Sequence, residues 1–422
     1  MKRFATTLTA LAFFACSKVE EKKTEYFPIF FTGVMFPGFV SGQPDQTEQV
    51  KFIQWLKARL ATRSYEAVAG YNLFDLGNDS LCSRLQNSGL QVISGRTYDN
   101  GWAWPPVTCA YGFWSETGLA KLAWDQWRLT SASTDFPASK RAMAINDRDV
   151  KLIRDFAVDG GQLSGGDIVY ISKPIFDVVA KPYVDGGNSP DLDFEVDRTV
   201  TNIYSSLSQA GWNPQRVALA IELLDPRATA TAPTTKAGQP VPSSAQGLVD
   251  TLTCDTSIAT FATTCYRSFV KNLVRQVALA KQPEWLFVGT SLERYAVANP
   301  QDFTNLASLY REIYFDLKDA GVTSKIGPGI DWAVLRAQAA SGGTGTDGGA
   351  AAVSMSTYWA SVVAPFLHQP VATGVDGGVA YTGAATADLI GVSAFINSAD
   401  YNGFANDIPT TYFDDLFVLA VK

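Results

Sequence analysis

Short continuous apolar runs alternate along the chain with longer segments in which apolar residues recur at helical spacing. The clearest example is residues 283–332, where the apolar run 285–289 has the length of a strand buried on both faces. Asn299 and Pro300 then predict the start of a helix, and residues 325–330 predict the next strand. A strand, a helix and a strand in this order predict parallel pairing through a right-handed crossover.

The same alternation continues over most of the chain. Further strands are predicted at residues 26–36, 89–94, 168–172, 216–224 and 388–395, and helices at 50–60, 147–157, 196–207, 266–277, 358–367 and 409–419. This pattern indicates a parallel α/β fold, and a (β/α)8 TIM-type barrel is its most economical form, with an open doubly wound sheet as the alternative. We expect one barrel domain, residues 26–422, with insertions at about 96–140, 227–247 and 341–353.

The N-terminus has the pattern of a targeting segment. Lys2 and Arg3 precede an apolar stretch at residues 4–14, which is too short to span a bilayer. It leads into Cys16 and resembles a bacterial lipoprotein signal. We therefore expect a signal peptide at 1–15, an acylated Cys16, a charged tether at 16–25, and a lipid-anchored, extracytoplasmic protein of the outer membrane or cell surface. An ordinary secretory signal with a chance cysteine is the alternative.

The other cysteines agree with export. Cys82, Cys109, Cys254 and Cys265 are an even number, which suits two disulfides. Proximity in sequence favours the pairs Cys82–Cys109 and Cys254–Cys265 among the three possible pairings. Because the chain has no C-x-x-C motif, a thiol redox or metal-binding role for these residues is not expected.

Composition argues against several classes of function. The net charge is −7 and no basic run follows the first residues, which argues against a nucleic-acid partner. His368 is the only histidine, which argues against a His-rich zinc site and a Ser-His-Asp triad. The acidic segment 185–195 lacks EF-hand spacing, so a solvated loop is expected there, with calcium binding through Asp185, Asp191, Asp193 and Glu195 as the alternative. No metal or other cofactor is expected. The 10 Trp, 16 Tyr and 25 Phe fill a core or supply rings that stack on sugars.

A succession of features resembles the retaining (β/α)8 glycosidase clan. The features are a buried strand ending in Val-Gly, a polar loop, a long helix, Ala-Gly-Val-Thr-Ser-Lys-Ile-Gly at 320–327 and Asp-Leu-Ile-Gly-Val-Ser at 388–393. They look most like the bacterial endo-galactanase family and the uncharacterised barrel lipoproteins related to it, over about residues 216–415. The resemblance implies a barrel that acts on, or binds, a polysaccharide or oligosaccharide.

The resemblance also implies which residues occupy the site. In the family the fourth strand ends in Gly-Asn-Glu, whose Glu is the general acid/base, and this motif falls on residues 289–291 here. Ser291 therefore stands at the acid/base position. Glu293, two residues later, is the nearby carboxylate, and alternation in an extended chain would point it the same way as Ser291.

Two later strands are matched in the same way. The Gly-x-x-Trp motif of the family's fifth strand falls on residues 329–332, and the sixth strand corresponds to residues 388–395. With this correspondence the chain ends before a seventh strand, which in the family carries the nucleophilic Glu. The resemblance thus implies a barrel that is incomplete at its C-terminus.

Retaining glycoside hydrolysis needs two carboxyl groups about 5 Å apart, one protonated and one ionised. Glu222 and Glu293, at predicted strand ends, form the candidate catalytic pair. The candidate substrate-binding residues beside these ends are Ser291, Tyr295, Asp331, Trp332 and Asp225. A structural role is the alternative for both carboxylates, because Glu293 can pair with Arg294 at the surface and the sequence does not fix which face of its strand Glu222 takes.

Two functions follow from these residues. The first is an extracytoplasmic, glycoside-hydrolase-like lipoprotein, a retaining O-glycosyl hydrolase. The second is a non-catalytic glycan-binding or structural surface lipoprotein, derived from a degenerate or truncated glycosidase. Ser291 and the implied loss of the nucleophile's strand favour the second function.

Overall fold

The structure is a computed structural model of the 422-residue chain. It describes residues 24–35, 39–40, 43–44, 46–70, 113–114, 120–145, 147–159, 162–163, 166–174, 192–224, 261–340, 353–373, 378–396, 401 and 404–422. The predicted signal peptide, the tether up to residue 23, the predicted strand 89–94 and the insertion 227–247 lie outside these residues, as do parts of the insertions at 96–140 and 341–353.

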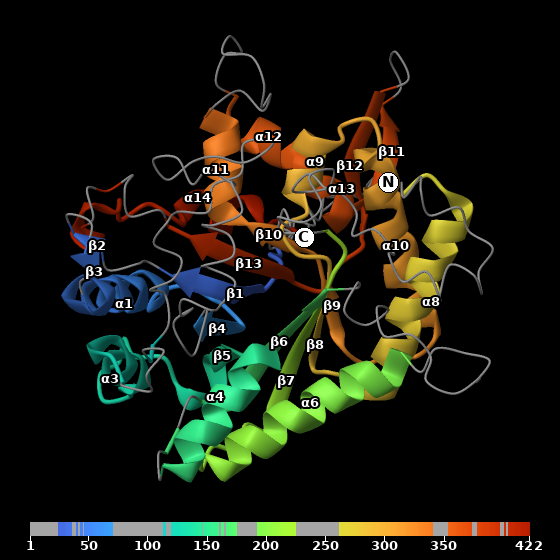
Figure 1. Cartoon of the computed structure of the whole chain (residues 1–422). Coiled ribbons are helices and arrows are strands. Elements are labelled where there is room, and N and C mark those ends of the chain that lie inside the picture. Colours follow the sequence, from blue (N-terminus) through green and yellow to red (C-terminus); the bar gives the residue numbers. More distant parts are fainter. Residues whose placement is uncertain are drawn as a thin grey trace, which may run out of the picture.

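A parallel sheet is the centre of the fold (Figure 1). Its strands follow the order β10-β13-β1-β4-β5-β6-β7-β8-β9, and every neighbouring pair is parallel. The strands are β1 (Ile29–Met35), β4 (Ala67–Gly70), β5 (Arg141–Ile145), β6 (Ile168–Pro174), β7 (Arg216–Glu222), β8 (Trp285–Val288), β9 (Lys325–Gly327), β10 (Gly329–Asp331) and β13 (Ile390–Phe395).

The sheet starts and ends on one chain segment. Only Pro328 separates β9, which pairs with β8, from β10, which pairs with β13. The N–H of Asp388 donates to the carbonyl of Ile326, and that of Gly391 to the carbonyl of Pro328, both across the seam. Eight chain segments therefore make the described barrel, and the predicted (β/α)8 fold is confirmed.

This topology corrects the strand numbers that the resemblance implies. The segment β9–β10 is the seventh strand and β13 is the eighth, so the expectation of a missing seventh strand is wrong. The strand β8, matched to the family's fourth, is the sixth. The implied numbers came from matching residues 289–291, 329–332 and 388–395 to the family's motifs, and each of these segments lies two strands later in the barrel. The strands β4 and β5 were not predicted, because their sequences Ala-Val-Ala-Gly and Arg-Ala-Met-Ala-Ile are short and rich in small residues.

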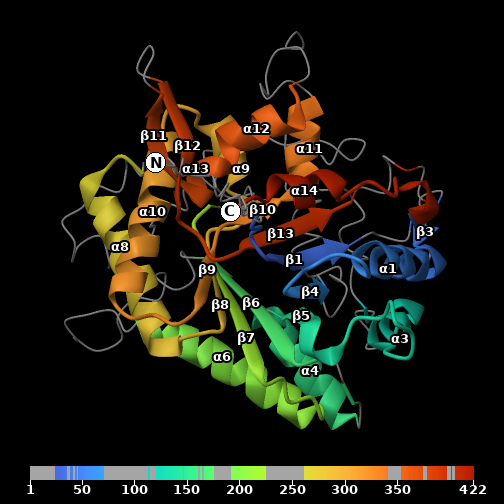
Figure 2. The same ribbon diagram turned by 180° about the vertical axis from the view of Figure 1, so that it is seen from behind.

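Helices cover the outside of the strands, as Figures 1 and 2 show from opposite sides. They are α1 (Gln46–Leu60), α3 (Leu122–Arg128), α4 (Asp147–Val158), α6 (Leu192–Gln209), α8 (Thr264–Lys281), α9 (Glu293–Ala298), α10 (Phe303–Asp319), α11 (Trp332–Ala340), α12 (Met355–Val362), α13 (Ala364–Leu367) and α14 (Asp414–Leu419). The antiparallel hairpin of β11 (His368–Thr373) and β12 (Gly378–Ala385) precedes β13, and β2 (Phe39–Val40) pairs with β3 (Gln43–Pro44).

One helix start differs from the prediction. Asn299 does not begin a helix but ends α9, where its N–H donates to the carbonyl of Tyr295 over 2.8 Å. The long helix α10 begins at Phe303 instead. The sequence signal at Asn299 and Pro300 marks the turn between two helices, and the first of them replaces the predicted polar loop.

The barrel interior is packed by alternate positions of the strands. Small residues on β4, β5 and β7 make room for large rings from the opposite strands, because a closed barrel of eight strands has space for few bulky side chains. Phe30 packs edge-on against both Trp285 and Phe287, with ring centroids 5.2 and 5.3 Å apart. The interior cluster consists of Phe30, Ala67, Ala69, Ala142, Ile168, Tyr170, Ala218, Ala220, Trp285, Phe287 and Leu389.

Charged residues close the end of the barrel where the strands begin. Glu66 accepts hydrogen bonds from Lys325 Nζ at 2.8 Å and from Trp285 Nε1 at 3.4 Å. The guanidinium of Arg216 lies over the ring of Trp285, 4.4 Å from its centroid, and pairs with Glu284. These charged groups pair with one another and so stabilise the end of the barrel where the strands begin. A functional site is therefore expected at the opposite end, where the strands finish.

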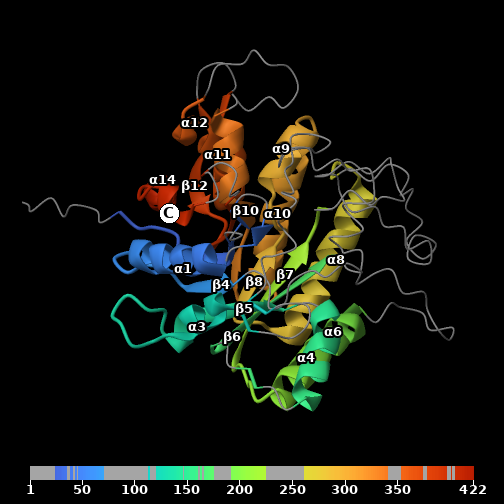
Figure 3. The same ribbon diagram turned by 60° about the vertical axis from the view of Figure 1, so that its left-hand side comes forward.

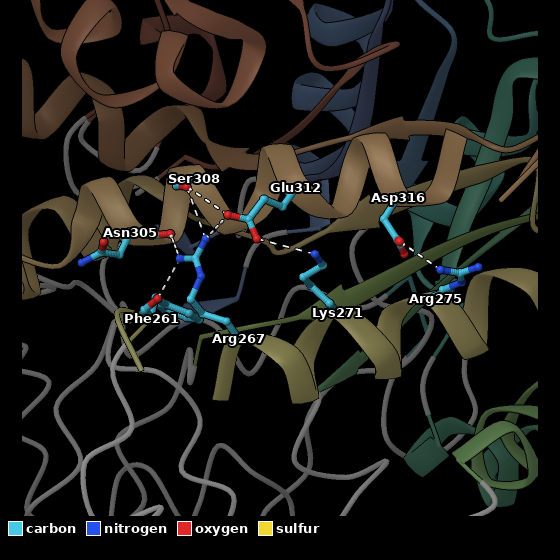
Figure 4. A network of polar contacts seen from close by, with 8 residues as sticks. All are labelled: Phe261, Arg267, Lys271, Arg275, Asn305, Ser308, Glu312 and Asp316. Atoms are coloured by element: carbon cyan, nitrogen blue, oxygen red, sulfur yellow. Dashed lines mark hydrogen bonds and ion pairs between the residues drawn. The ribbon is translucent and has the colours of Figure 1, made fainter. Parts of the chain in front are cut away.

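Outside the barrel, α8 and α10 lie side by side and are joined by a polar network (Figure 4). Arg267 pairs with Glu312 and also donates to the carbonyl of Phe261 at 2.8 Å. Further along, Arg275 and Asp316 are 2.9 Å apart. These pairs are partly exposed to solvent, so each contributes on the order of 1 kcal/mol or less, and they help to orient the two helices.

The two ends of the described chain pair with each other (Figure 3). Tyr26 and Val421 form an antiparallel bridge, and the N–H of Phe27 donates to the carbonyl of Ala420 over 2.7 Å. The chain thus enters and leaves the barrel at the same place. None of the helices that the structure describes is both long and apolar enough to cross a bilayer.

Barrel closure can be tested at Gly327. A Cβ atom there would lie 2.2 Å from the carbonyl oxygen of Leu389, which belongs to the neighbouring backbone and cannot move aside. We expect Gly327→Ala to lower the free energy of unfolding by about 2–3 kcal/mol, measured by urea denaturation. Gly321→Ala is the control, because its Cβ meets nothing within 4 Å and only its positive φ costs about 1 kcal/mol. Equal losses for both variants would contradict the proposed contact across the seam.

Candidate functional site

The carboxyl ends of the strands meet at one edge of the barrel, where barrel enzymes hold their substrates. The side chains that face the interior at this edge follow from strand alternation. On β7, Ala218 and Ala220 lie in the interior cluster, so Glu222 faces the same way. On β6, Ile168 and Tyr170 lie in that cluster, so Ser172 also faces inward. The face of Glu222, which the sequence left open, is thereby determined.

Glu222 and Ser172 are partners across two neighbouring strands. The hydroxyl of Ser172 donates a hydrogen bond to Glu222 Oε1. Both side chains are half-buried, which leaves part of each accessible from the end of the barrel. A carboxylate that is oriented by a neighbouring hydroxyl and reaches solvent can accept further hydrogen bonds from a ligand.

A second group of carboxylates lies at the ends of the sixth and seventh strands. Glu293, the first residue of α9, is fully buried, and its Oε2 accepts the N–H of Asp331 at 3.1 Å. Asp331, the last residue of β10, is also buried and lies 3.2 Å from Arg294 Nη2. Arg294 Nε is 3.7 Å from Glu293 Oε1. These three residues form a buried ionic cluster that joins α9 to the seventh strand.

Burial changes the proton affinity of this cluster. Loss of solvation is the largest cause, and together with the nearby Asp331 it raises the pKa of Glu293 to about 8, against the lowering effect of Arg294. Loss of solvation also raises the pKa of Asp331. Two ionised carboxylates beside one guanidinium would leave one buried negative charge, and a proton on Glu293 removes it. Burial beside Asp331 thus favours the protonated form of Glu293.

Asp331 has a second structural task. Its Oδ1 accepts the N–H groups of Ala333 at 3.0 Å and Val334 at 3.2 Å, which caps the start of α11. The seventh strand, which carries the nucleophilic Glu in the family described above, therefore does end in a carboxylate here. Both oxygens of that carboxylate are engaged, one by the helix start and the other by Arg294.

A tight turn leads from the sixth strand into α9. Gly289 and Ser291 both have positive φ values, 84° and 51°. The N–H of Leu292 donates to the carbonyl of Gly329 at 3.1 Å, and the N–H of Gly329 donates to the carbonyl of Gly289 at 3.0 Å. This turn allows the chain to reverse from strand to helix within four residues. It places Glu293 against the seventh strand rather than in line with Ser291, so the predicted alternation between Ser291 and Glu293 is wrong.

Three of the remaining candidate residues belong to the described part of the chain: Tyr295, Trp332 and Ser291. Tyr295 is buried, and its hydroxyl donates to Asp302 at 2.7 Å. Trp332 is buried, and its Nε1 donates to the carbonyl of Tyr412 at 2.9 Å. Ser291 is half-exposed beside the turn. Substrate-binding roles for these residues stay predictions, and the packing of Tyr295 and Trp332 shows that both also support the helices.

Asp225, Cys16, Cys82, Cys109 and Cys254 lie outside the described residues, and Cys265 lies in α8 with its side chain outside the described part. The two disulfides and the acylation site therefore stay predictions. In the part of the chain that the structure describes, no group of three or more His, Cys, Asp or Glu side chains could hold a metal ion.

Two site residues went unrecognised in the sequence. Ser172 could have been found from the alternation of Ile168, Tyr170 and Ser172 along a strand that pairs in register with β7. Arg294 was noted only as a surface partner of Glu293, because its burial depends on how α9 packs against the seventh strand. No signal in the sequence predicts that packing.

No family model matches this chain, and no curated protein sequence matches it. Among solved structures, its fold resembles an exo-beta-1,4-mannosidase from Opitutaceae bacterium strain TAV5, with a TM-score of 0.27 and 13% identity over 47% of this chain and 29% of that chain. It also resembles the GH20 beta-N-acetylhexosaminidase from Streptomyces coelicolor A3(2), with a TM-score of 0.25 and 12% identity over 67% and 64% of the two chains. This chain thus spans less than two thirds of either enzyme.

Neither of them is an endo-galactanase, so the narrower resemblance to that family stays a prediction.

The raised pKa of Glu293 predicts a pH dependence of stability. Its folded pKa of about 8 lies above the ordinary value of 4.5, so its contribution to stability is complete below about pH 4.5 and is lost as the pH rises towards 8. The slope per proton is at most about 1.4 kcal/mol per pH unit. Glu293→Gln mimics the protonated acid, so we expect the difference in unfolding free energy between variant and parent to grow in the variant's favour from pH 5 to pH 8.

Urea denaturation at several pH values measures this difference. Glu284→Gln is a suitable control, because its carboxylate pairs with Arg216 at the opposite end of the barrel. A difference between Glu293→Gln and the parent that stays constant from pH 5 to pH 8 would show that Glu293 is ionised throughout.

Proposed function

We propose that this chain is an extracytoplasmic, glycoside-hydrolase-like barrel, attached to the bacterial envelope through an acylated Cys16, that binds a polysaccharide at the carboxyl edge of its strands. The observation that carries the proposal is the inward-facing, half-buried Glu222, oriented by Ser172 of the neighbouring strand. The class of ligand comes from the sequence resemblance to the retaining glycosidase clan, and the place comes from the strand topology.

The chemistry of this edge suits a sugar. Sugar hydroxyl groups donate hydrogen bonds, and a carboxylate accepts several of them at once. Hydrogen bonds to a charged partner are about twice as strong as neutral ones. Because Ser172 already orients Glu222, little side-chain entropy is lost when a ligand binds. Glycan binding, unlike hydrolysis, therefore requires only side chains that are accessible at this edge, such as Glu222 and Ser172.

Hydrolysis is the second candidate function, and one observation favours it. The raised pKa of Glu293 favours its protonated form, which a general acid needs, and Glu222 at the same edge is only half-buried. The complete burial of Glu293 ranks this function behind binding, because a general acid has to reach the glycosidic oxygen.

Polysaccharide binding is tested by titrating the purified mature chain with galactan and mannan oligosaccharides in a calorimeter. We expect Glu222→Gln to weaken binding about tenfold or more, because a hydrogen bond to a charged acceptor contributes about 1.5–3 kcal/mol. Glu312→Gln, on α10 outside the barrel, is the matched control and should bind like the parent. Equal affinities for Glu222→Gln and the parent would exclude the edge as the site.

Hydrolysis is tested by measuring the release of reducing ends from the same glycans. If Glu293 is the acid, Glu293→Gln should lower turnover about a hundredfold or more while binding is retained. Equal turnover by the variant and the parent would remove Glu293 from the reaction. Binding without any release of reducing ends would identify the chain as a non-catalytic glycan-binding protein.

A further inference from the structure

Ser393, near the end of the eighth strand, carries a hydroxyl group that faces the interior of the barrel. Leu389, directly before β13, lies in the interior cluster, and a Cβ atom on Gly391 would lie 2.6 Å from the ring of Phe287. Both positions therefore face inward, and because side chains alternate along a strand, Ser393 faces inward as well. Ser393 is half-buried, whereas the outward-facing Val392 beside it is buried.

Solvent reaches into the barrel at the carboxyl ends of its strands. The half-buried side chains that face inward there are Ala144 on β5, Ser172 on β6, Glu222 on β7 and Ser393 on β13. We call these four residues the mouth of the barrel. Three of them are small, so they occupy less of the interior than the rings of the cluster below. A barrel of eight strands can hold one small ligand where side chains leave room for it.

Ser393 and Ser172 lie on opposite walls of the mouth. In the order of the closed barrel β6 is the fourth strand and β13 is the eighth, so half of the circumference separates the two residues. Glu222 follows on the fifth strand, beside Ser172. On the other wall the register places Gly33 of β1 next to Ser393, and a glycine adds no side chain at that level. A ligand in the mouth therefore meets polar atoms on both sides.

The two serines present hydrogen-bond acceptors, because their protons are engaged within the protein. A serine hydroxyl has one proton and two lone pairs. Ser172 donates its proton to Glu222 Oε1, and Ser393 donates its proton to the carbonyl of Ile330 over 3.3 Å. Each Oγ atom can then accept a hydrogen bond, and the carboxylate of Glu222 is an acceptor as well. The mouth thus suits a ligand that donates hydrogen bonds from two opposite edges.

We propose that the mouth binds one sugar ring, whose free hydroxyl groups donate to Ser393 on one wall and to Ser172 and Glu222 on the other. The proposal rests on the polysaccharide binding proposed above and narrows the class of ligand. The ring carries unsubstituted hydroxyl groups on opposite edges, because an ester or ether group there accepts hydrogen bonds but cannot donate them. Ser393 is then a specificity-determining residue, since a site built to bind a hydroxyl group rejects an analogue that lacks it.

Fluorinated sugars test this inference, because fluorine is close to a hydroxyl group in size but cannot donate a hydrogen bond. The probes are methyl galactosides and methyl mannosides in which fluorine replaces one hydroxyl group at a time. Each probe competes in a calorimeter with the galactan or mannan oligosaccharide that binds the parent chain. We expect fluorine at one ring position to weaken binding to the parent about fivefold or more, and to have no further cost in Ser393→Ala.

Ser361→Ala is the matched control, because the hydroxyl of Ser361 also donates to a backbone carbonyl, that of Tyr358 over 2.9 Å, on α12 outside the barrel. It should bind the oligosaccharide and every probe like the parent. Comparison of two ligands on one variant cancels any general loss of folded protein.

The inference is overturned if Ser393→Ala binds the oligosaccharide like the parent, or if fluorine at every ring position costs the variant as much as the parent. An unchanged Ser393→Ala beside a weakened Glu222→Gln would overturn this inference alone. A parent chain that binds no oligosaccharide would overturn the proposed function together with it.

Discussion

Backbone pairing on both sides of one segment, residues 325–331, holds the structure together. This segment bonds to β8 through its first half and to β13 through its second, with Pro328 at the change. A parallel sheet exposes unpaired N–H and C=O groups at each edge unless it closes, and here one segment removes both edges. The glycines along it follow from the same constraint, because a Cβ on Gly327 or Gly329 would collide with neighbouring backbone.

The closing segment also connects folding with the candidate site. It ends in Asp331, which caps α11, pairs with Arg294 and donates its N–H to Glu293. The loop after the sixth strand is thus held against the seventh by the residues that close the barrel. A buried cluster of this kind contributes little net stability, since desolvation offsets attraction, but removal of one partner leaves an unbalanced charge. The rigid side of the barrel edge is therefore distinct from the accessible side at Glu222 and Ser172.

The sequence predicted the parts of the fold with strong local signals. Long apolar runs such as β7 and periodic helices such as α10 were found because burial on both faces, or on one face, leaves a readable pattern. The short strands β4 and β5 were missed, since small residues chosen to fit the barrel interior carry little hydrophobic signal. The seventh strand seemed lost for another reason, because the motifs at residues 289–291, 329–332 and 388–395 were assigned to strands two places too early.

The candidate site residues, too, could be predicted only where the sequence carries a local signal. Glu222 could be placed at a strand end, but the burial of Glu293 depends on a turn with positive φ at Ser291 that sequence spacing does not reveal.

The pairing of residues 25–27 with residues 420–422 has a mechanical consequence. Any pull on the N-terminal segment loads these backbone hydrogen bonds before it reaches β1. Residues 420–422 therefore shield the first barrel strand from force. Removal of residues 420–422 would break this pairing and transfer the load directly to β1.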